Sequence, residues 1–116
     1  MRSLILLNFF IAASMFTFGQ QSKVAIKDPS KPVQTVEASC GQCQFGLKGK
    51  GCDLAVRLGG KAYYVSGTAI NDHGDAHDKE GFCNAIRKAD VQGTLVKNKF
   101  VVTYFKLLPT EGSQRP

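Results

Sequence analysis

A glycine pair at positions 59–60 separates two runs in which apolar and other residues alternate. In the first run, Leu54, Val56 and Leu58 share one face of an extended chain, because successive side chains of a strand point to opposite faces. Glycines between alternating runs provide the positive φ angles of a tight hairpin turn. The pair therefore predicts an antiparallel β-hairpin and indicates a β-rich fold.

A second hairpin is predicted over residues 89–108, with its turn at 97–99. The run after the turn is rich in aromatic and β-branched residues, which favour strands. Alternation places Val91 and Leu95 on one face of the run before the turn. We therefore expect a single core that contains Val56, Leu58, Val91, Leu95 and Val102.

The segment between the two hairpins, residues 71–89, begins as a polar loop. Its second part is predicted to be a short helix with Asp78 as the N-cap. Phe82, Ile86 and Ala89 recur at helical spacing and form the expected buried stripe of this helix.

A further short strand is predicted over residues 33–40, so the expected order is three strands, one helix and two strands. This order is typical of the OB-fold, a five-stranded Greek-key barrel. The predicted fold class is therefore mainly β: a small five-stranded OB-like barrel with one short helix between the third and fourth strands. An α+β sandwich with the same element order is the alternative.

The chain begins with a short basic start followed by an apolar run over residues 4–18. This run is shorter than the about 20 residues of a membrane span, and it ends in small residues. The pattern is typical of a cleaved export signal, so we expect a periplasmic or secreted protein with no membrane span after cleavage. The predicted organisation is a signal peptide at 1–19, a flexible linker at 20–32, a single OB-like domain at 33–109 and a polar tail at 110–116.

Fifteen Lys and Arg residues against nine Asp and Glu residues give the chain a net charge of +6. The basic residues are spread along the chain, which indicates a solvated surface, so no nucleic-acid partner is expected. The chain has neither the nucleophile elbow of hydrolases nor a phosphate-binding glycine loop. We therefore predict a non-enzymatic binding or structural domain.

Three of the four cysteines lie close together in the sequence, and the fourth lies in the segment before the second hairpin. If the first three strands form a meander, the loops after the first and the third strand lie at the same end of the sheet. These two loops carry every cysteine and histidine of the chain. The candidate metal ligands at this rim are Cys40, Cys43, Cys52 and Cys83, with His73 and His77 as weaker candidates.

Four cysteines in a small exported chain are typical of two structural disulfides. A bond between Cys40 and Cys52 would close the start of the first hairpin. A bond between Cys43 and Cys83 would attach the predicted helix to the loop that follows the first strand.

A metal site is the second interpretation. A CxxC turn places two thiolates on one ion, and Cys52 and Cys83 complete a four-thiolate set, in which His73 or His77 could replace one sulfur. Such a set suits zinc or copper as Cu(I).

The third interpretation is a thiol–disulfide redox carrier that uses Cys40 and Cys43 of the CxxC motif. The stretch that follows is broken by glycines and is a poor helix, whereas redox motifs of this kind begin a helix. The sequence leaves all three interpretations open.

The stretches CGQCQFGLKGKGCDLAVRLGGKAYYV, HGDAH and GFCNAIRKADVQG together cover most of the folded unit. On these residues the chain resembles a family of small exported bacterial proteins of unknown function with a CxxC motif. The resemblance implies export and a single domain, and it implies no activity.

Overall fold

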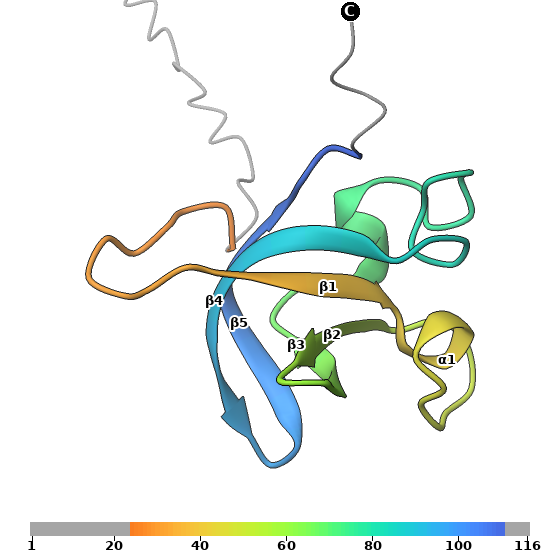
Figure 1. Cartoon of the computed structure of the whole chain (residues 1–116), viewed down its shortest axis with the longest axis horizontal. Coiled ribbons are helices and arrows are strands. Elements are labelled where there is room, and N and C mark those ends of the chain that lie inside the picture. The colour runs from red at the N-terminus through yellow and green to blue at the C-terminus, as the bar shows by residue number, and fades with distance from the viewer. Residues whose placement is uncertain (1–23, 111–116) are drawn as a thin grey trace, which may run out of the picture.

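The computed structural model describes residues 24–110, and the expected signal peptide at 1–19 lies outside them. Strands dominate the described part of the chain (Figure 1). The elements in chain order are β1 (Gln34–Cys40), α1 (Gly41–Gln44), β2 (Leu54–Leu58), β3 (Lys61–Ser66), the 3-10 helix η1 (Ile70–His73), β4 (Arg87–Val96) and β5 (Lys99–Leu107).

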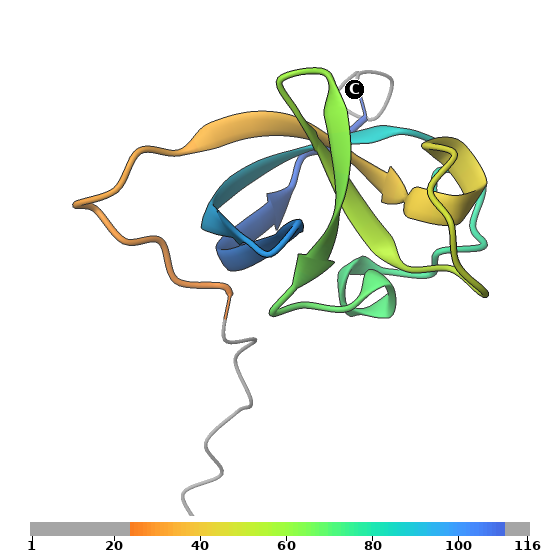
Figure 2. The same ribbon diagram turned by 90° about the horizontal axis from the view of Figure 1, so that it is seen from below.

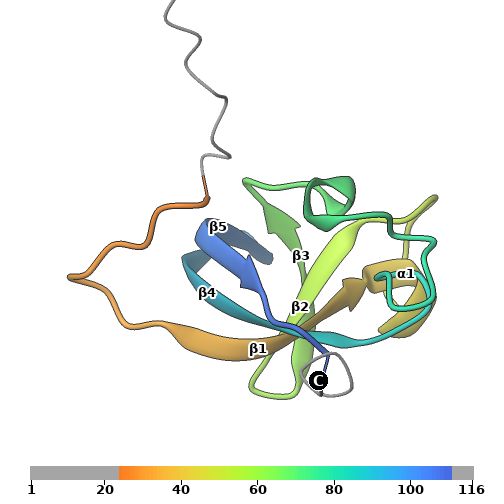
Figure 3. The same cartoon turned by 90° about the horizontal axis from the view of Figure 1, so that it is seen from above.

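The strands close into a barrel in the order β1-β2-β3-β5-β4, which Figures 2 and 3 show from two opposite sides. β1, β2 and β3 form an antiparallel meander, and β4 and β5 form a hairpin. Antiparallel pairing of β1 with β4 and a short parallel contact between β3 and β5 complete the barrel. The predicted mainly-β fold class, a five-stranded barrel with a short helical element between the third and fourth strands, is confirmed.

Both predicted hairpin turns are present. Leu58 pairs with Lys61 across a glycine pair at 59–60 in which both φ angles are positive. In the other turn, Lys97 and Asn98 have φ angles of 49° and 64°, as a two-residue type I′ turn requires. These turns determine the register of the strands on either side of them.

The core is continuous inside the barrel, and its central aliphatic residues are Val56 and Val91, both 0% exposed. Leu58 packs against this core without being fully buried. The expectation that Leu95 belongs to the core is wrong, because its side chain is 49% exposed beside the β4–β5 turn. Alternation along the strand places Leu95 on the inner face, but the side chain is exposed because it lies next to the turn.

The α-helix expected from Asp78 is also wrong. The helical element between β3 and β4 is instead the single 3-10 turn Ile70–His73, and residues from 74 to 86 form turns and loops. Of the expected buried stripe, Phe82 is 3% exposed, but Ile86 is 43% exposed. Ala89 is buried as part of β4, where it pairs with Val36.

The segment before β1 contacts the barrel from residue 24 onward. Val24 is 3% exposed, and its carbonyl accepts a hydrogen bond from the Phe105 N–H at 3.0 Å. Gln92 of β4 bonds the backbone of Asp28 and Lys31. Within residues 24–110, no helix has both the length and the apolar character that a membrane crossing requires.

Candidate metal centre

The four cysteines meet at one rim of the barrel although they come from three separate stretches of the chain. Cys40 is the last residue of β1, and Cys43 lies in α1 immediately after it. Cys52 precedes β2, and Cys83 lies in the long connection between β3 and β4. In all three ribbon views α1 lies beside this connection, which is the consequence of the meander (Figures 1–3).

The sulfur atoms of Cys40, Cys43, Cys52 and Cys83 all lie within 4.8 Å of one another. The shortest separations are 2.6 Å between the Sγ atoms of Cys40 and Cys43 and 3.3 Å between those of Cys43 and Cys52. All four cysteines are free thiols in this structure. Neither disulfide pairing considered from the sequence is present, and both remain predictions.

Hydrogen bonds outside the sulfur atoms hold the cysteine-bearing segments together. The Cys40 N–H donates to the carbonyl of Phe82 at 3.0 Å, and this bond joins β1 to the residue before Cys83. The Gln44 side-chain amide donates to the carbonyl of Cys83 at 2.9 Å, and this bond joins α1 to the same connection. The cluster is therefore positioned by the fold and does not depend on sulfur–sulfur bonds.

The stretch before β2 is held in the same way. Gln42 accepts a hydrogen bond from the Asp53 N–H at 2.9 Å and donates one to the Asp53 carboxylate at 2.7 Å. The Gly41 N–H donates to the Asp53 carbonyl at 2.8 Å. Three bonds thus connect α1 with the residue that follows Cys52.

Gly41 allows α1 to pack directly on the barrel. A Cβ atom at this buried position would lie 2.7 Å from Cε1 of Tyr64 and 3.1 Å from Cβ of Ala55. Both distances are below or near the shortest that real side chains show, so only glycine fits without a shift of α1. The glycine inside the CxxC motif is therefore explained by packing against β2 and β3.

The pKa values of three of the cysteines depend on their sulfur neighbours. Two hydrogen bonds, the stronger with Cys40 and the weaker with Cys52, raise the pKa of Cys43 far above its ordinary value. Burial is the main cause that raises the pKa of Cys83 to about 11, and a hydrogen bond with Cys52 is the second. Hydrogen bonds from Cys43, Cys83 and Cys40 lower the pKa of Cys52. Four thiolates around one point repel each other, so only a cation at that point stabilises all four at once.

The two histidines do not join the four-sulfur group. The half-buried His73 ring lies 4.3 Å from that of Phe105, centroid to centroid, and its Nε2 is 2.9 Å from the Thr68 hydroxyl. Burial lowers the pKa of His73. His77 is exposed and lies 3.9 Å from a carboxylate oxygen of Asp75. His73 is therefore a packed aromatic residue of the barrel end.

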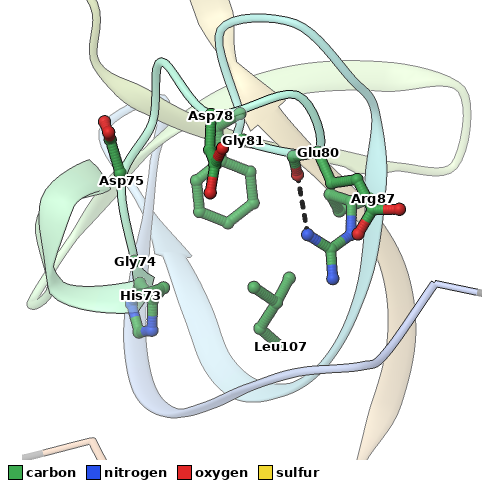
Figure 4. Close-up of a pocket in the computed structure, with 9 residues that line it drawn as sticks. His73, Gly74, Asp75, Asp78, Glu80, Gly81, Arg87 and Leu107 are labelled. Atoms are coloured by element: carbon green, nitrogen blue, oxygen red, sulfur yellow. Dashed lines mark hydrogen bonds between the residues drawn. The ribbon is translucent and has the colours of Figure 1, made fainter. Parts of the chain in front are cut away.

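His73 also lines a separate cavity of about 150 Å³. Figure 4 shows His73 and Arg87 on opposite sides of this cavity, with Leu107 between them. The Arg87 guanidinium donates to the carbonyls of Glu80 and Leu108 at 2.7 and 2.8 Å, and these bonds hold the loop after η1 against the end of β5. All but one of the lining residues belong to the stretch 73–87, and Leu107 of β5 completes the wall, so the cavity forms only when this stretch folds against the end of β5.

Four convergent cysteine sulfurs fit a soft metal ion. A tetrahedral site with metal–sulfur bonds of about 2.3 Å has sulfur–sulfur separations of about 3.8 Å. No two of the four sulfurs lie more than 4.8 Å apart, but the pairs Cys40–Cys43 at 2.6 Å and Cys43–Cys52 at 3.3 Å are closer than this, so the Cys43 side chain has to move outward to admit an ion. The arrangement thus defines a small β-barrel domain with a four-cysteine cluster at one rim.

Residues 34–108 match the model of a family of unknown function (DUF6370), and the chain belongs to this family. The match spans the barrel from the first residue of β1 to the residue after β5. No curated protein and no solved structure matches the chain.

Proposed function

We propose that this protein is a non-enzymatic domain that binds one soft metal ion through Cys40, Cys43, Cys52 and Cys83. Zinc is the ion that a tetrahedral set of four thiolates suits best, and Cu(I) is the alternative with the same ligand chemistry. The observation that carries the proposal is that all four sulfurs lie within 4.8 Å of one another. Two disulfides require only two close pairs, whereas one ion requires all four sulfurs to converge.

The redox-carrier alternative has less support. A carrier needs an exposed nucleophilic thiol with a lowered pKa at the first cysteine of its CxxC motif. Here Cys40, the first cysteine, is 0% exposed, and Cys43 is exposed but has a raised pKa. In this pair the first cysteine is buried, and the exposed cysteine is not activated by a lowered pKa.

The basic-apolar-small pattern of residues 1–19 supports the further proposal that the protein is exported and acquires its ion outside the cytoplasm. Protein recovered from its source cell is expected to begin near Gln20. N-terminal sequencing of that protein tests this part, and an intact Met1 on a cytoplasmic protein would contradict it.

The metal proposal is tested by intact mass and elemental analysis of protein produced in the periplasm with zinc and purified without a reductant. The expected result is one zinc per chain and four thiols after the metal is removed. A strong chelator is expected to lower the melting temperature, while a reductant alone leaves it unchanged, because binding of the ion is part of the folding free energy.

Single Cys→Ser variants at the four positions are expected to lose bound zinc. His77→Ala is the control, because its exposed ring lies outside the four-sulfur group, and it is expected to retain one zinc. Protein that is four hydrogens lighter than its all-thiol mass and carries no metal would overturn the metal proposal in favour of two disulfides.

A further inference from the structure

The four-sulfur group is closed on one side and open on the other. Cys40 is fully buried at the end of β1, Cys52 and Cys83 are half-buried, and Cys43 is exposed. An ion bound to all four sulfurs is therefore shielded by the barrel on the Cys40 side and faces solvent on the Cys43 side.

We propose that the bound ion is exchangeable cargo, and that it passes to a thiol-bearing acceptor through displacement of Cys43. This inference rests on the proposed metal site. It deepens the proposal because it names the route by which the ion leaves the site.

The backbone contacts support Cys43 as the ligand that leaves. The backbone of Cys40 is paired with Leu54 and bonded to Phe82, and Cys83 is held by hydrogen bonds at both its N–H and its carbonyl. Cys43 lies on a helix of only four residues, and its N–H donates to the Cys40 sulfur at 3.2 Å. Its exposed side chain can rotate toward solvent while the three remaining sulfurs keep their places.

The charge beside the open side suits an anionic acceptor. Lys48 and Lys50 are both exposed in the loop that joins Cys43 to Cys52, and this loop contains no acidic side chain. The one acidic side chain next to it, Asp53, is hydrogen-bonded to Gln42 at 2.7 Å, so the two lysines outnumber the adjacent acid. Positive charge raises the local concentration of an approaching anion and increases its association rate. We therefore expect the acceptor to be a thiol that carries negative charge, either a small molecule or an acidic protein.

The exchange step is a ligand substitution without a change of oxidation state. The acceptor sulfur forms a bond to the ion, the bond between the ion and the Cys43 sulfur breaks, and the proton of the incoming thiol passes to the Cys43 thiolate. Zinc accommodates such a step because it can bind a fifth ligand transiently. Repetition with further acceptor sulfurs releases the ion from Cys52, Cys83 and Cys40.

The test uses the full chain loaded with zinc, after its stoichiometry has been measured. Zinc release to a coloured chelator is followed with increasing 2-mercaptoethanesulfonate, an anionic monothiol, and with ethanesulfonate, which has no thiol. The expected rate rises in proportion to the thiol concentration and is unaffected by ethanesulfonate. Slow alkylation with iodoacetamide, mapped by mass spectrometry, is expected to modify Cys43 at least tenfold faster than the other three cysteines.

A matched pair of variants tests the charge argument. The double variant Lys48→Ala, Lys50→Ala is expected to slow release by the anionic thiol severalfold. Lys97→Ala with Lys99→Ala removes the same charge at the β4–β5 turn, away from α1 (Figure 1), and is expected to leave the rate unchanged. A further comparison separates the two acceptor sources: a small acidic protein with one exposed thiol replaces 2-mercaptoethanesulfonate at the same thiol concentration. Faster zinc release by this protein identifies a macromolecular acceptor.

The failure of this inference is distinguishable from that of the metal site. A chain that binds one zinc but releases it at a rate independent of thiol, or that is alkylated first at Cys52 or Cys83, overturns the exchange route alone. Equal effects of the two lysine pairs overturn the anionic acceptor. A chain that binds no ion overturns both proposals.

Discussion

The side-chain amide of Gln92 forms two reciprocal hydrogen bonds with the backbone of Asp28. Its Oε1 accepts from the Asp28 N–H at 2.8 Å, and its Nε2 donates to the Asp28 carbonyl at 2.7 Å. A third bond, from Nε2 to the Lys31 carbonyl, is 2.8 Å long. Because Gln92 is only 2% exposed, this one side chain attaches the segment before β1 to the barrel wall.

Gln92→Leu is therefore expected to lower the free energy of unfolding by about 1–3 kcal/mol, since it leaves the backbone polar groups of Asp28 and Lys31 without partners. Denaturant titration of the variant measures the loss. Thr94→Ala, at an exposed position two residues along the same strand, serves as the control and is expected to change stability by no more than about 0.5 kcal/mol. Equal stability of the two variants would show that the attachment contributes nothing.

Two positions of β4, one in the middle of the strand and one beside its turn, provide a test of the core. Val91 is 0% exposed and pairs with Phe105, whereas Leu95 is 49% exposed beside the turn. Val91→Asp buries an unpaired charge, and because such domains are stable by only about 5–15 kcal/mol in total, we expect this variant to be unfolded. Circular dichroism measures this directly.

Leu95→Asp is the matched control, and we expect it to fold with a cooperative transition. A folded, cooperative Val91→Asp variant would contradict the assignment of this face of β4 to the core. An unfolded Leu95→Asp variant would contradict the exposure of the turn.

The hairpins and the order of the strands along the chain could be predicted because they depend on local patterns. The glycine pair at 59–60 and the residues at 97–99 specify turns within a few residues, and alternation then places Val56 and Val91 inside. The proximity of the cysteines followed from the meander, since that topology puts both cysteine-bearing loops at one end.

Long-range contacts explain what the sequence did not reveal. The helical spacing of Phe82, Ile86 and Ala89 was misleading because Ala89 pairs with Val36 in a strand, and this pairing outweighs local helix propensity. The contacts of Gln92 with a segment more than sixty residues away leave no local pattern. The fit of Gly41 against Tyr64 likewise depends on residues that the chain brings together only when folded.

His73 is expected to make stability depend on pH. Burial is the main cause that lowers its pKa in the folded chain, although Asp72 opposes the effect, and the unfolded chain therefore binds a proton at higher pH than the folded one. Its stabilising contribution is complete above the ordinary imidazole pKa of 6.5, and it is lost as the pH falls from 6.5 to below the folded value.

The measurement is thermal unfolding of the wild type and of His73→Phe between pH 7.5 and 5. We expect the wild type to lose stability relative to the variant as the pH falls, because only the wild type must take up a proton at this site on unfolding. His77→Gln removes the exposed histidine and should follow the wild type. Parallel curves for wild type and His73→Phe would refute a lowered pKa of the half-buried His73 in the folded chain.

Gly41 links the packing of the barrel to the metal centre. A methyl group at this position would be placed 2.7 Å from the Tyr64 ring, so Gly41→Ala forces α1 away from β2 and β3 and displaces Cys43 from the other sulfurs. Overpacking of this kind costs about 1–3 kcal/mol of stability, and misplacement of a ligand is expected to lower metal affinity by about 10–100-fold. Competition with a chelator of known affinity measures the zinc constant.

Lys50→Ala is the control for Gly41→Ala, because this exposed loop residue lies between Cys43 and Cys52 and its change is expected to leave zinc affinity within about threefold of the wild type. The double change Gly41→Ala, Tyr64→Ala removes the ring that the new methyl group meets, and it should restore part of the lost affinity. Loss of zinc affinity in Gly41→Ala that Tyr64→Ala does not relieve would indicate that the new methyl group is obstructed by Leu47 and Ala55, whose side-chain atoms lie 3.0 and 3.1 Å from it, rather than by the Tyr64 ring.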